Sequence, residues 1–164
     1  MAKISPEIPD AYVETGYLSL PAEWLKLNSS FELNIPLKPR FISPHPYTNQ
    51  DVIALARGPL IYCVEDVDNP WVNDHFKSLL LGPTKAVDEV HISADVIGEP
   101  YVQLTLNNAA SILSIEKEDP PAIPCGGLVQ RGMAGIEKLV FIPYALRDNR
   151  GGKGMMRVGI RNKH

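Results

Sequence analysis

Two short, nearly continuous apolar runs separated by a tight turn place the strongest constraint on the fold. Val52–Ala56 and Leu60–Val64 flank the tripeptide Arg57-Gly58-Pro59. Apolar runs of this length are typical of strands that are buried on both faces of a sheet. Glycine and proline together favour a turn between them. The sequence therefore predicts a central β-hairpin over residues 52–64.

Strands are also predicted elsewhere, because apolar and polar residues alternate with the two-residue period of a half-buried strand. The chain has 15 prolines and 12 glycines in 164 residues. In a helix interior, a proline costs about 3 kcal/mol and a glycine about 1 kcal/mol relative to alanine, so this composition disfavours helices. The alternating segments are 31–38, 90–96, 102–106 and 156–161, and further short strands are expected at 17–20, 40–43 and 139–142. We expect an all-β fold, a jelly-roll-like β-sandwich of about eight to ten short antiparallel strands with at most one short helix.

The expected organisation is an N-terminal extension or remnant of a preceding segment over residues 1–15, followed by one β-sandwich domain over residues 16–164. A short helix is predicted over residues 73–81, with Asn73 as its N-cap and Gly82-Pro83 as its stop. The proline-rich stretch 120–127 predicts a long loop. Residues 139–142 and 156–161 are expected to form a final hairpin.

Charge and hydropathy exclude two classes of partner. The formal net charge is −3, and no basic stripe with interleaved aromatic residues is present, so we expect no nucleic-acid partner. No apolar stretch approaches the length of a membrane span, and the N-terminus lacks the apolar core of a signal peptide, so a cytoplasmic location without membrane contact is expected. Cys63 and Cys125 are then expected to be reduced thiols rather than one disulfide.

The residue types that bind metals or act as nucleophiles do not form a recognisable site. The four histidines, His45, His75, His91 and His164, are scattered, and no zinc-binding spacing of cysteines or histidines occurs. Cys63 lies inside an apolar run, where burial suppresses its thiolate. We therefore expect neither a metal nor another cofactor in this chain.

Two loop sequences have both a structural and a functional interpretation. Glu65, Asp66 and Asp68 form a dense acidic cluster, which fits a solvated turn better than the carboxylate pair of a glycosidase. Residues 151–154 read Gly-Gly-Lys-Gly. They lack the leading glycine and the Ser or Thr of a phosphate-binding loop, so we expect a hairpin turn there.

Several side chains are candidates for contact with another surface. Aromatic residues in or beside loops stack on sugar rings or pack against a neighbouring domain. An arginine at a strand corner offers five donors, either to its own domain or to an adjoining one, and both interpretations are open for Arg57 and Arg150. The candidate interdomain or sugar contacts are His45, Arg57, Trp71, Tyr144, Asn149 and Arg150.

A set of short motifs resembles the C-terminal β-rich region of glycoside hydrolase family 127, the β-L-arabinofuranosidase-like enzymes. The motifs are Gly16-Tyr17, Trp24, His45-Pro46, residues 57–63, residues 141–144 and Asn149-Arg150-Gly151. In that family, cleavage is attributed to a cysteine nucleophile in a zinc–thiolate site and a glutamate acid/base, all in an upstream (α/α)₆ barrel. None of these catalytic residues has a counterpart here. The resemblance implies that zinc belongs only to a catalytic domain outside this chain.

Our leading hypothesis is a non-catalytic β-sandwich module that packs against such a barrel and stabilises it. The alternative is a carbohydrate-binding module for arabinose-containing glycans. A third reading is an autonomous hydrolase that uses Cys63 and Glu65. Expected partners are the catalytic barrel and, as further candidates, a second copy of the chain and arabinosides.

Overall fold

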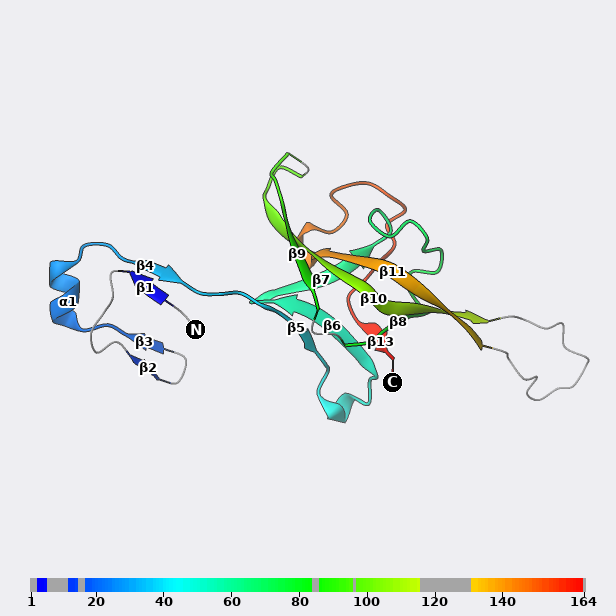
Figure 1. Cartoon of the computed structure of the whole chain (residues 1–164), viewed down its shortest axis with the longest axis horizontal. Coiled ribbons are helices and arrows are strands. Elements are labelled where there is room, and N and C mark those ends of the chain that lie inside the picture. The colour runs from blue at the N-terminus through cyan, green and yellow to red at the C-terminus, as the bar shows by residue number, and fades with distance from the viewer. Residues whose placement is uncertain are drawn as a thin grey trace, which may run out of the picture. The chain divides into compact units, whose positions relative to one another are not determined.

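The computed structural model describes residues 3–5, 12–14, 17–83, 86–95, 97–115 and 131–163 (Figure 1). The chain divides into two units, residues 1–38 and 39–164. The boundary expected after residue 15 lies inside the first unit. No helix among the described residues is long and apolar enough to cross a membrane, and the cytoplasmic location stays a prediction.

The first unit consists of short elements. They are β1 (Lys3–Ser5), β2 (Tyr12–Glu14), β3 (Tyr17–Ser19), α1 (Ala22–Leu27) and β4 (Glu32–Asn34). Strand β1 pairs antiparallel with β4, and β2 pairs with β3. Helix α1 was not expected from the sequence. Glu23 in its first turn and Lys26 in its last turn suit the helix dipole, and their side chains form an ion pair of 2.7 Å.

The second unit contains the large sheet. Its elements are β5 (Pro39–Ile42), the 3₁₀ helix η1 (Pro46–Thr48), β6 (Val52–Arg57), β7 (Leu60–Glu65), β8 (Leu79–Leu81), β9 (Asp88–Ile92), β10 (Tyr101–Ile115), β11 (Arg131–Pro143), the 3₁₀ helix η2 (Tyr144–Leu146), β12 (Met156–Arg157) and β13 (Ile160–Asn162). Strands β10 and β11 are the longest, and their far ends continue as a two-stranded ribbon at the right of Figure 1.

Strand pairing follows the order β12-β7-β11-β10-β8-β13-β6-β5, with β9 beside β10. An additional pairing of β6 with β7 closes the strands β7, β11, β10, β8, β13 and β6 into a circuit. All pairs are antiparallel except β8 with β13. The all-β class is confirmed; the jelly-roll arrangement stays a prediction, because the described strands of this unit form one large mixed sheet.

The central hairpin is confirmed. Strands β6 and β7 pair antiparallel, with Arg57 opposite Leu60, and Gly58 takes the positive φ of 56° that the turn requires. Tyr62, Cys63 and Val64 are buried on both faces of the sheet. Burial of the whole run was wrong, however, because the first two residues of β7, Leu60 and Ile61, are exposed.

The helix predicted over residues 73–81 is wrong. His75 and Phe76 have φ values of 55° and 58°, which a right-handed helix cannot contain. Asp74 instead accepts a hydrogen bond of 2.8 Å from the backbone N–H of Ser78. The apolar residues that suggested a helical stripe, Phe76 and Leu79–Leu81, enter the core from a turn and from strand β8.

The predicted final hairpin is also wrong. Strand β12 pairs with β7, and β13 pairs with β6 and β8, so neither forms a ladder with β11 among the described residues. Apolar and polar residues do alternate over residues 156–161, but the segment is divided between the two strands β12 and β13. The predicted loop over residues 120–127 and the thiol of Cys125 lie outside the described part of the chain.

Candidate functional site

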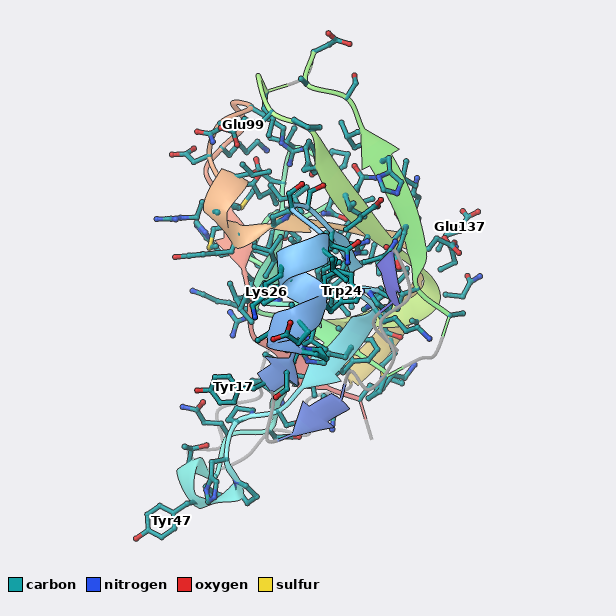
Figure 2. The ribbon with its side chains drawn as sticks, turned by 90° about the vertical axis from the view of Figure 1, so that its left-hand side faces the viewer. Tyr17, Trp24, Lys26, Tyr47, Glu99 and Glu137 are labelled. Carbon is teal, nitrogen blue, oxygen red and sulfur yellow. The ribbon has the colours of Figure 1, made fainter. Side chains whose placement is uncertain are left out.

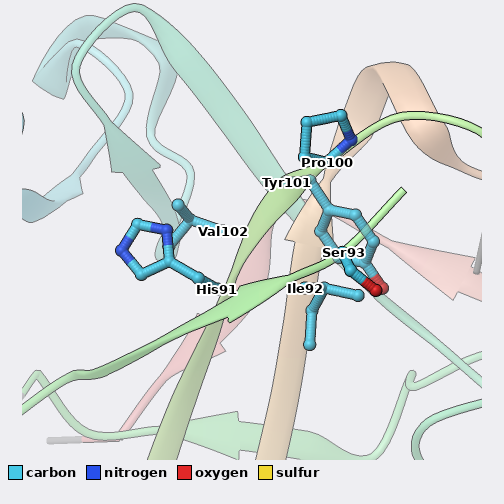
Figure 3. Close-up of a pocket in the computed structure, with 6 residues that line it drawn as sticks. All are labelled: His91, Ile92, Ser93, Pro100, Tyr101 and Val102. Atoms are coloured by element: carbon cyan, nitrogen blue, oxygen red, sulfur yellow. The ribbon is translucent and has the colours of Figure 1, made fainter. Parts of the chain in front are cut away.

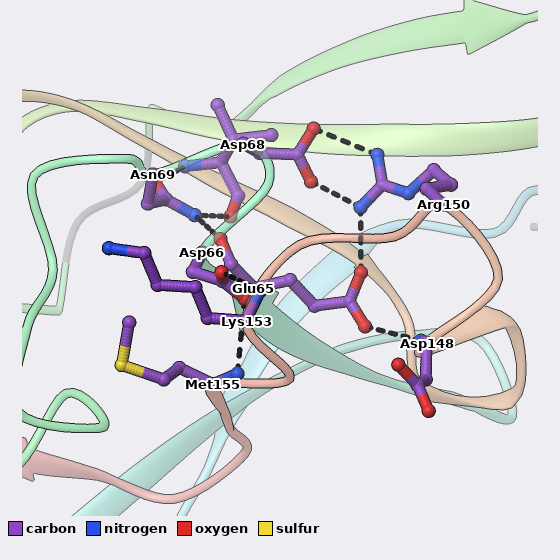
Figure 4. Close-up of polar contacts among 9 residues, drawn as sticks. Glu65, Asp66, Asp68, Asn69, Asp148, Arg150, Lys153 and Met155 are labelled. Atoms are coloured by element: carbon purple, nitrogen blue, oxygen red, sulfur yellow. Dashed lines mark hydrogen bonds and ion pairs between the residues drawn. The ribbon is translucent and has the colours of Figure 1, made fainter.

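The acidic turn after β7 is held by one buried arginine (Figure 4). Arg150 donates from Nη1 to Asp68 Oδ1 at 2.8 Å, from Nη2 to Glu65 Oε2 at 2.8 Å, and from Nη2 to Asp68 Oδ2. Its side chain is only 9% exposed. Burial opposes the charge of the guanidinium, but the hydrogen bonds to Asp68 and Glu65 raise the pKa of Arg150 above its ordinary value.

The second carboxylate of the turn organises the late loop. Asp66 accepts hydrogen bonds from the backbone N–H groups of Lys153 at 2.6 Å and Met155 at 3.1 Å. Glu65 Oε1 accepts another from the N–H of Asp148 at 2.7 Å. The prediction of a solvated turn is wrong: Glu65 and Asp66 are buried. Their charges are tolerated because each is paired or hydrogen-bonded.

Asn69 completes this cluster and was missed as a key residue. Its side chain is fully buried and bonds to Glu65 and to Val140 in β11. The adjacent Pro70 made the dipeptide look like an ordinary turn signal. No local pattern marks a polar side chain whose main partner is 71 residues away.

The glycine loop packs directly against the acidic turn. Gly151, Gly152 and Gly154 all have positive φ. The hairpin turn predicted here is nevertheless wrong, because the loop joins η2 to β12, which pairs with β7. A Cβ on Gly152 would lie 2.6 Å from Val67 Cγ2 and 3.1 Å from a carboxylate oxygen of Asp66. Only glycine therefore allows this approach.

Gly152→Ala is expected to lower the free energy of unfolding by roughly 3 kcal/mol, through positive-φ strain and overpacking against Asp66. Gly154→Ala is the matched control, since it has a φ of +72° but nothing within 4 Å of its added Cβ. It should cost about 1 kcal/mol from strain alone. Urea denaturation of both variants measures the difference; equal losses would mean that the contact with the acidic turn contributes nothing.

Cys63, the nucleophile of the autonomous-hydrolase reading, lies in the sheet interior. It has no exposed surface. Burial and the nearby Glu65 carboxylate raise the pKa of its thiol to about 12. Glu65, the proposed acid/base of the same reading, is ion-paired with Arg150 at 2.8 Å. Burial therefore suppresses the thiolate of Cys63, and the carboxylate of Glu65 is held in an ion pair with Arg150.

Alkylation of Cys63 by iodoacetamide at pH 8 should be slower in the folded than in the urea-unfolded protein by roughly a thousandfold or more, since a pKa near 12 removes most of the thiolate and burial blocks access. Mass spectrometry of the peptide that contains Cys63 gives the rate separately from Cys125. Comparable rates in both states would restore Cys63 as a reactive thiol.

Arg57 borders a cleft at the hairpin end of the sheet. Its Nε donates to Glu89 Oε2 at 2.6 Å, so the side chain clamps β6 to β9 within the domain. The cleft has a volume of about 340 Å³. It is lined by Arg57, Leu60, Tyr62, Glu99, Pro100, Tyr101, Val102, Pro143, Ala145 and Leu146. This lining is mostly apolar, with one ion pair at its edge.

The remaining predicted contact residues are placed as follows. His45 is exposed, and its Nδ1 accepts from the N–H of Tyr47, whose own ring projects from η1 (Figure 2). Trp71 packs against the core with its ring edge-on to Phe76 at 5.8 Å. Tyr144 is partly exposed, with the Arg147 guanidinium 4.5 Å from its ring centre. Asn149 is exposed on the late loop.

These candidates do not form one site. Tyr144, Asn149 and Arg150 share one segment of the chain, whereas Arg57 ends β6 and His45 precedes η1. Contact of any of them with another domain or with a sugar stays a prediction.

A cavity of about 400 Å³ lies where β9 meets β10 (Figure 3). His91 and Val102 are register partners, and Ile92 pairs with Tyr101. Figure 3 shows the imidazole of His91 beside Val102 and away from the ring of Tyr101. The cavity gathers no set of convergent polar groups.

Among the described residues, no group of three or more His, Cys, Asp or Glu side chains could hold a metal ion, so these residues do not fit a zinc site.

Comparison with known families defines the class of this fold. Residues 39–161 match the family described as "Glycoside hydrolase family 127 C-terminal domain". The chain belongs to this family, and the resemblance seen in its motifs is confirmed. No match was found among curated proteins.

Solved structures share the fold. A family 127 β-L-arabinofuranosidase from Geobacillus stearothermophilus T6 is 22% identical with a TM-score of 0.66, covering 99% of this chain and 24% of that one. A family 127 β-arabinofuranosidase is 23% identical with a TM-score of 0.69, covering 99% and 23%. A glycoside hydrolase is 18% identical with a TM-score of 0.64, covering 99% and 26%. This chain thus spans about a quarter of the length of these enzymes.

Proposed function

We propose that this chain serves a β-L-arabinofuranosidase-like hydrolase as a non-catalytic module that packs against the catalytic (α/α)₆ barrel and stabilises it. One observation carries the proposal: the two potentially reactive side chains near the central hairpin, Cys63 and Glu65, are buried inside the domain. Cys63 is buried as a neutral thiol, and the carboxylate of Glu65 forms an ion pair with Arg150. In this proposal zinc and the catalytic residues belong to the barrel.

The cleft beside Arg57 supports packing against another domain. Leu60, at the start of β7, lines this cleft and is 43% exposed, and the Arg57–Glu89 pair lies at the same end of the sheet. An apolar patch with a charged rim is the usual composition of a domain interface.

The test uses a fusion in which this chain replaces the C-terminal domain of the Geobacillus stearothermophilus enzyme, compared with the upstream polypeptide alone. We expect the upstream part to unfold at a higher temperature in the fusion. Leu60→Asp should remove the gain, whereas Met133→Asp, at an exposed apolar residue on β11, should retain it. No gain in the fusion, or hydrolysis of an arabinofuranoside by this chain alone, would overturn the proposal.

A further inference from the structure

The described side chains of the first unit form no buried core. Among residues 17–38, none is buried. Tyr17 on β3 is 77% exposed and projects from the ribbon (Figure 2). The rings of Trp24 on α1 and Phe31 lie edge to face, with 5.9 Å between their centres. A segment of this composition in a folded enzyme is normally covered by other chain.

The segment around β4 has the alternating pattern of a strand that packs one face against a hydrophobic core. Phe31, Leu33, Ile35 and Leu37 are 42%, 40%, 59% and 37% exposed, and we call these four the apolar row. Alternate residues of extended backbone share a face, and Glu32 and Asn34 take the opposite one. The sequence predicted a half-buried strand over residues 31–38; the structure has a strand over Glu32–Asn34 only, and its residues are exposed.

Among the described residues, one edge of strand β4 is unpaired. Its ladder partner among the described residues is β1 alone, through Glu32, Leu33 and Asn34. An edge strand presents unpaired N–H and C=O groups, which pair readily with a further strand. Pro36 has no N–H, so pairing is favoured over residues 31–35.

The comparisons indicate what covers this strand. The family match begins at Pro39, whereas the likeness to the solved enzymes covers 99% of the chain and so includes the first unit. Residues before Pro39 thus belong to a part of the enzyme fold that precedes the C-terminal domain. About three quarters of each solved enzyme lies outside the match.

We propose that residues 31–38 are a docking strand for the upstream part of the enzyme, which adds a β-strand to the free edge of β4 and buries the apolar row. Backbone hydrogen bonds would supply affinity, and pockets for alternate side chains would supply register. This inference rests on the proposed function, because it needs an upstream enzyme domain as the occupant. It assigns a second attachment point, separate from the cleft beside Arg57.

Hydrogen exchange on this chain alone and on the fusion tests the docking strand. We expect amide protection over residues 31–35 to rise at least tenfold in the fusion. Leu33→Asp with Ile35→Asp should abolish the rise, whereas Asn34→Asp, on the other face of the same strand, should preserve it. No rise over these amides overturns the docking strand, and a retained gain in thermal stability would still support the proposed function.

Two other occupants would also overturn it. The β1–β4 ladder already protects some of these amides, so the comparison uses the amides that β1 does not bond. If the chain alone protects those amides too, its own residues cover the row. If sedimentation shows a dimer of the chain alone that Leu33→Asp dissociates, a second copy is the occupant.

Discussion

Arg150→Met is expected to lower the free energy of unfolding of the second unit by about 3–5 kcal/mol, as measured by urea denaturation. The substitution removes the partner of Glu65 and Asp68 while it keeps most of the side-chain volume. Glu65 would be left as a buried carboxylate without its ion pair, at a position where the side chain is 6% exposed. The loss comes mainly from this uncompensated charge and not from packing.

Three variants separate charge from packing. Arg150→Lys keeps the positive charge but cannot donate to both carboxylates in a fixed fork, so most of the loss should persist. Adding Glu65→Gln and Asp68→Asn to Arg150→Met should recover part of it. Arg57→Met removes a more exposed pair with Glu89 and should cost only about 1 kcal/mol. Equal losses for Arg150→Met and Arg57→Met would contradict a special role for the buried cluster.

The parts of this fold that could be predicted from the sequence are the local ones. The hairpin of β6 and β7 follows from two adjacent apolar runs and a glycine turn. The Glu65–Arg150 pair could not be predicted, because its members are 85 residues apart and each resembles an ordinary loop charge. The acidic turn was expected to be solvated for the same reason: only the folded loop over residues 148–155 excludes water from it.

The predicted helix over residues 73–81 failed because tertiary packing overrode a short periodic pattern. Phe76 is buried from a backbone with φ of 58°, a conformation that no helical spacing reveals. Of the candidate contacts, Arg57 and Arg150 proved to have partners within the domain. A sequence alone gives the residue type suited to a clamp, but not whether its partner lies inside or outside the domain.

Asn69→Leu should lower the free energy of unfolding by about 3 kcal/mol, because three hydrogen bonds in the interior lose their partner while the side chain keeps its branching and its number of heavy atoms. Asn69 Nδ2 donates to the carbonyls of Glu65 at 2.8 Å and Val140 at 3.0 Å, and Oδ1 accepts from the N–H of Val140 at 3.0 Å. Urea denaturation gives the loss. Amide exchange at Val140 should quicken specifically, since that donor is left without its acceptor.

Asn69→Asp shows which half of the amide matters. Its carboxylate still accepts from Val140 but faces two carbonyl oxygens without a proton to donate, so we expect a loss at least as large at pH 7. The exposed Asn107, which donates to Asp88 at 2.7 Å, is the control; Asn107→Leu should change stability by no more than about 0.5 kcal/mol. A similar cost at both positions would mean that the hydrogen bonds from Asn69 to β11 contribute no more to stability than a surface contact.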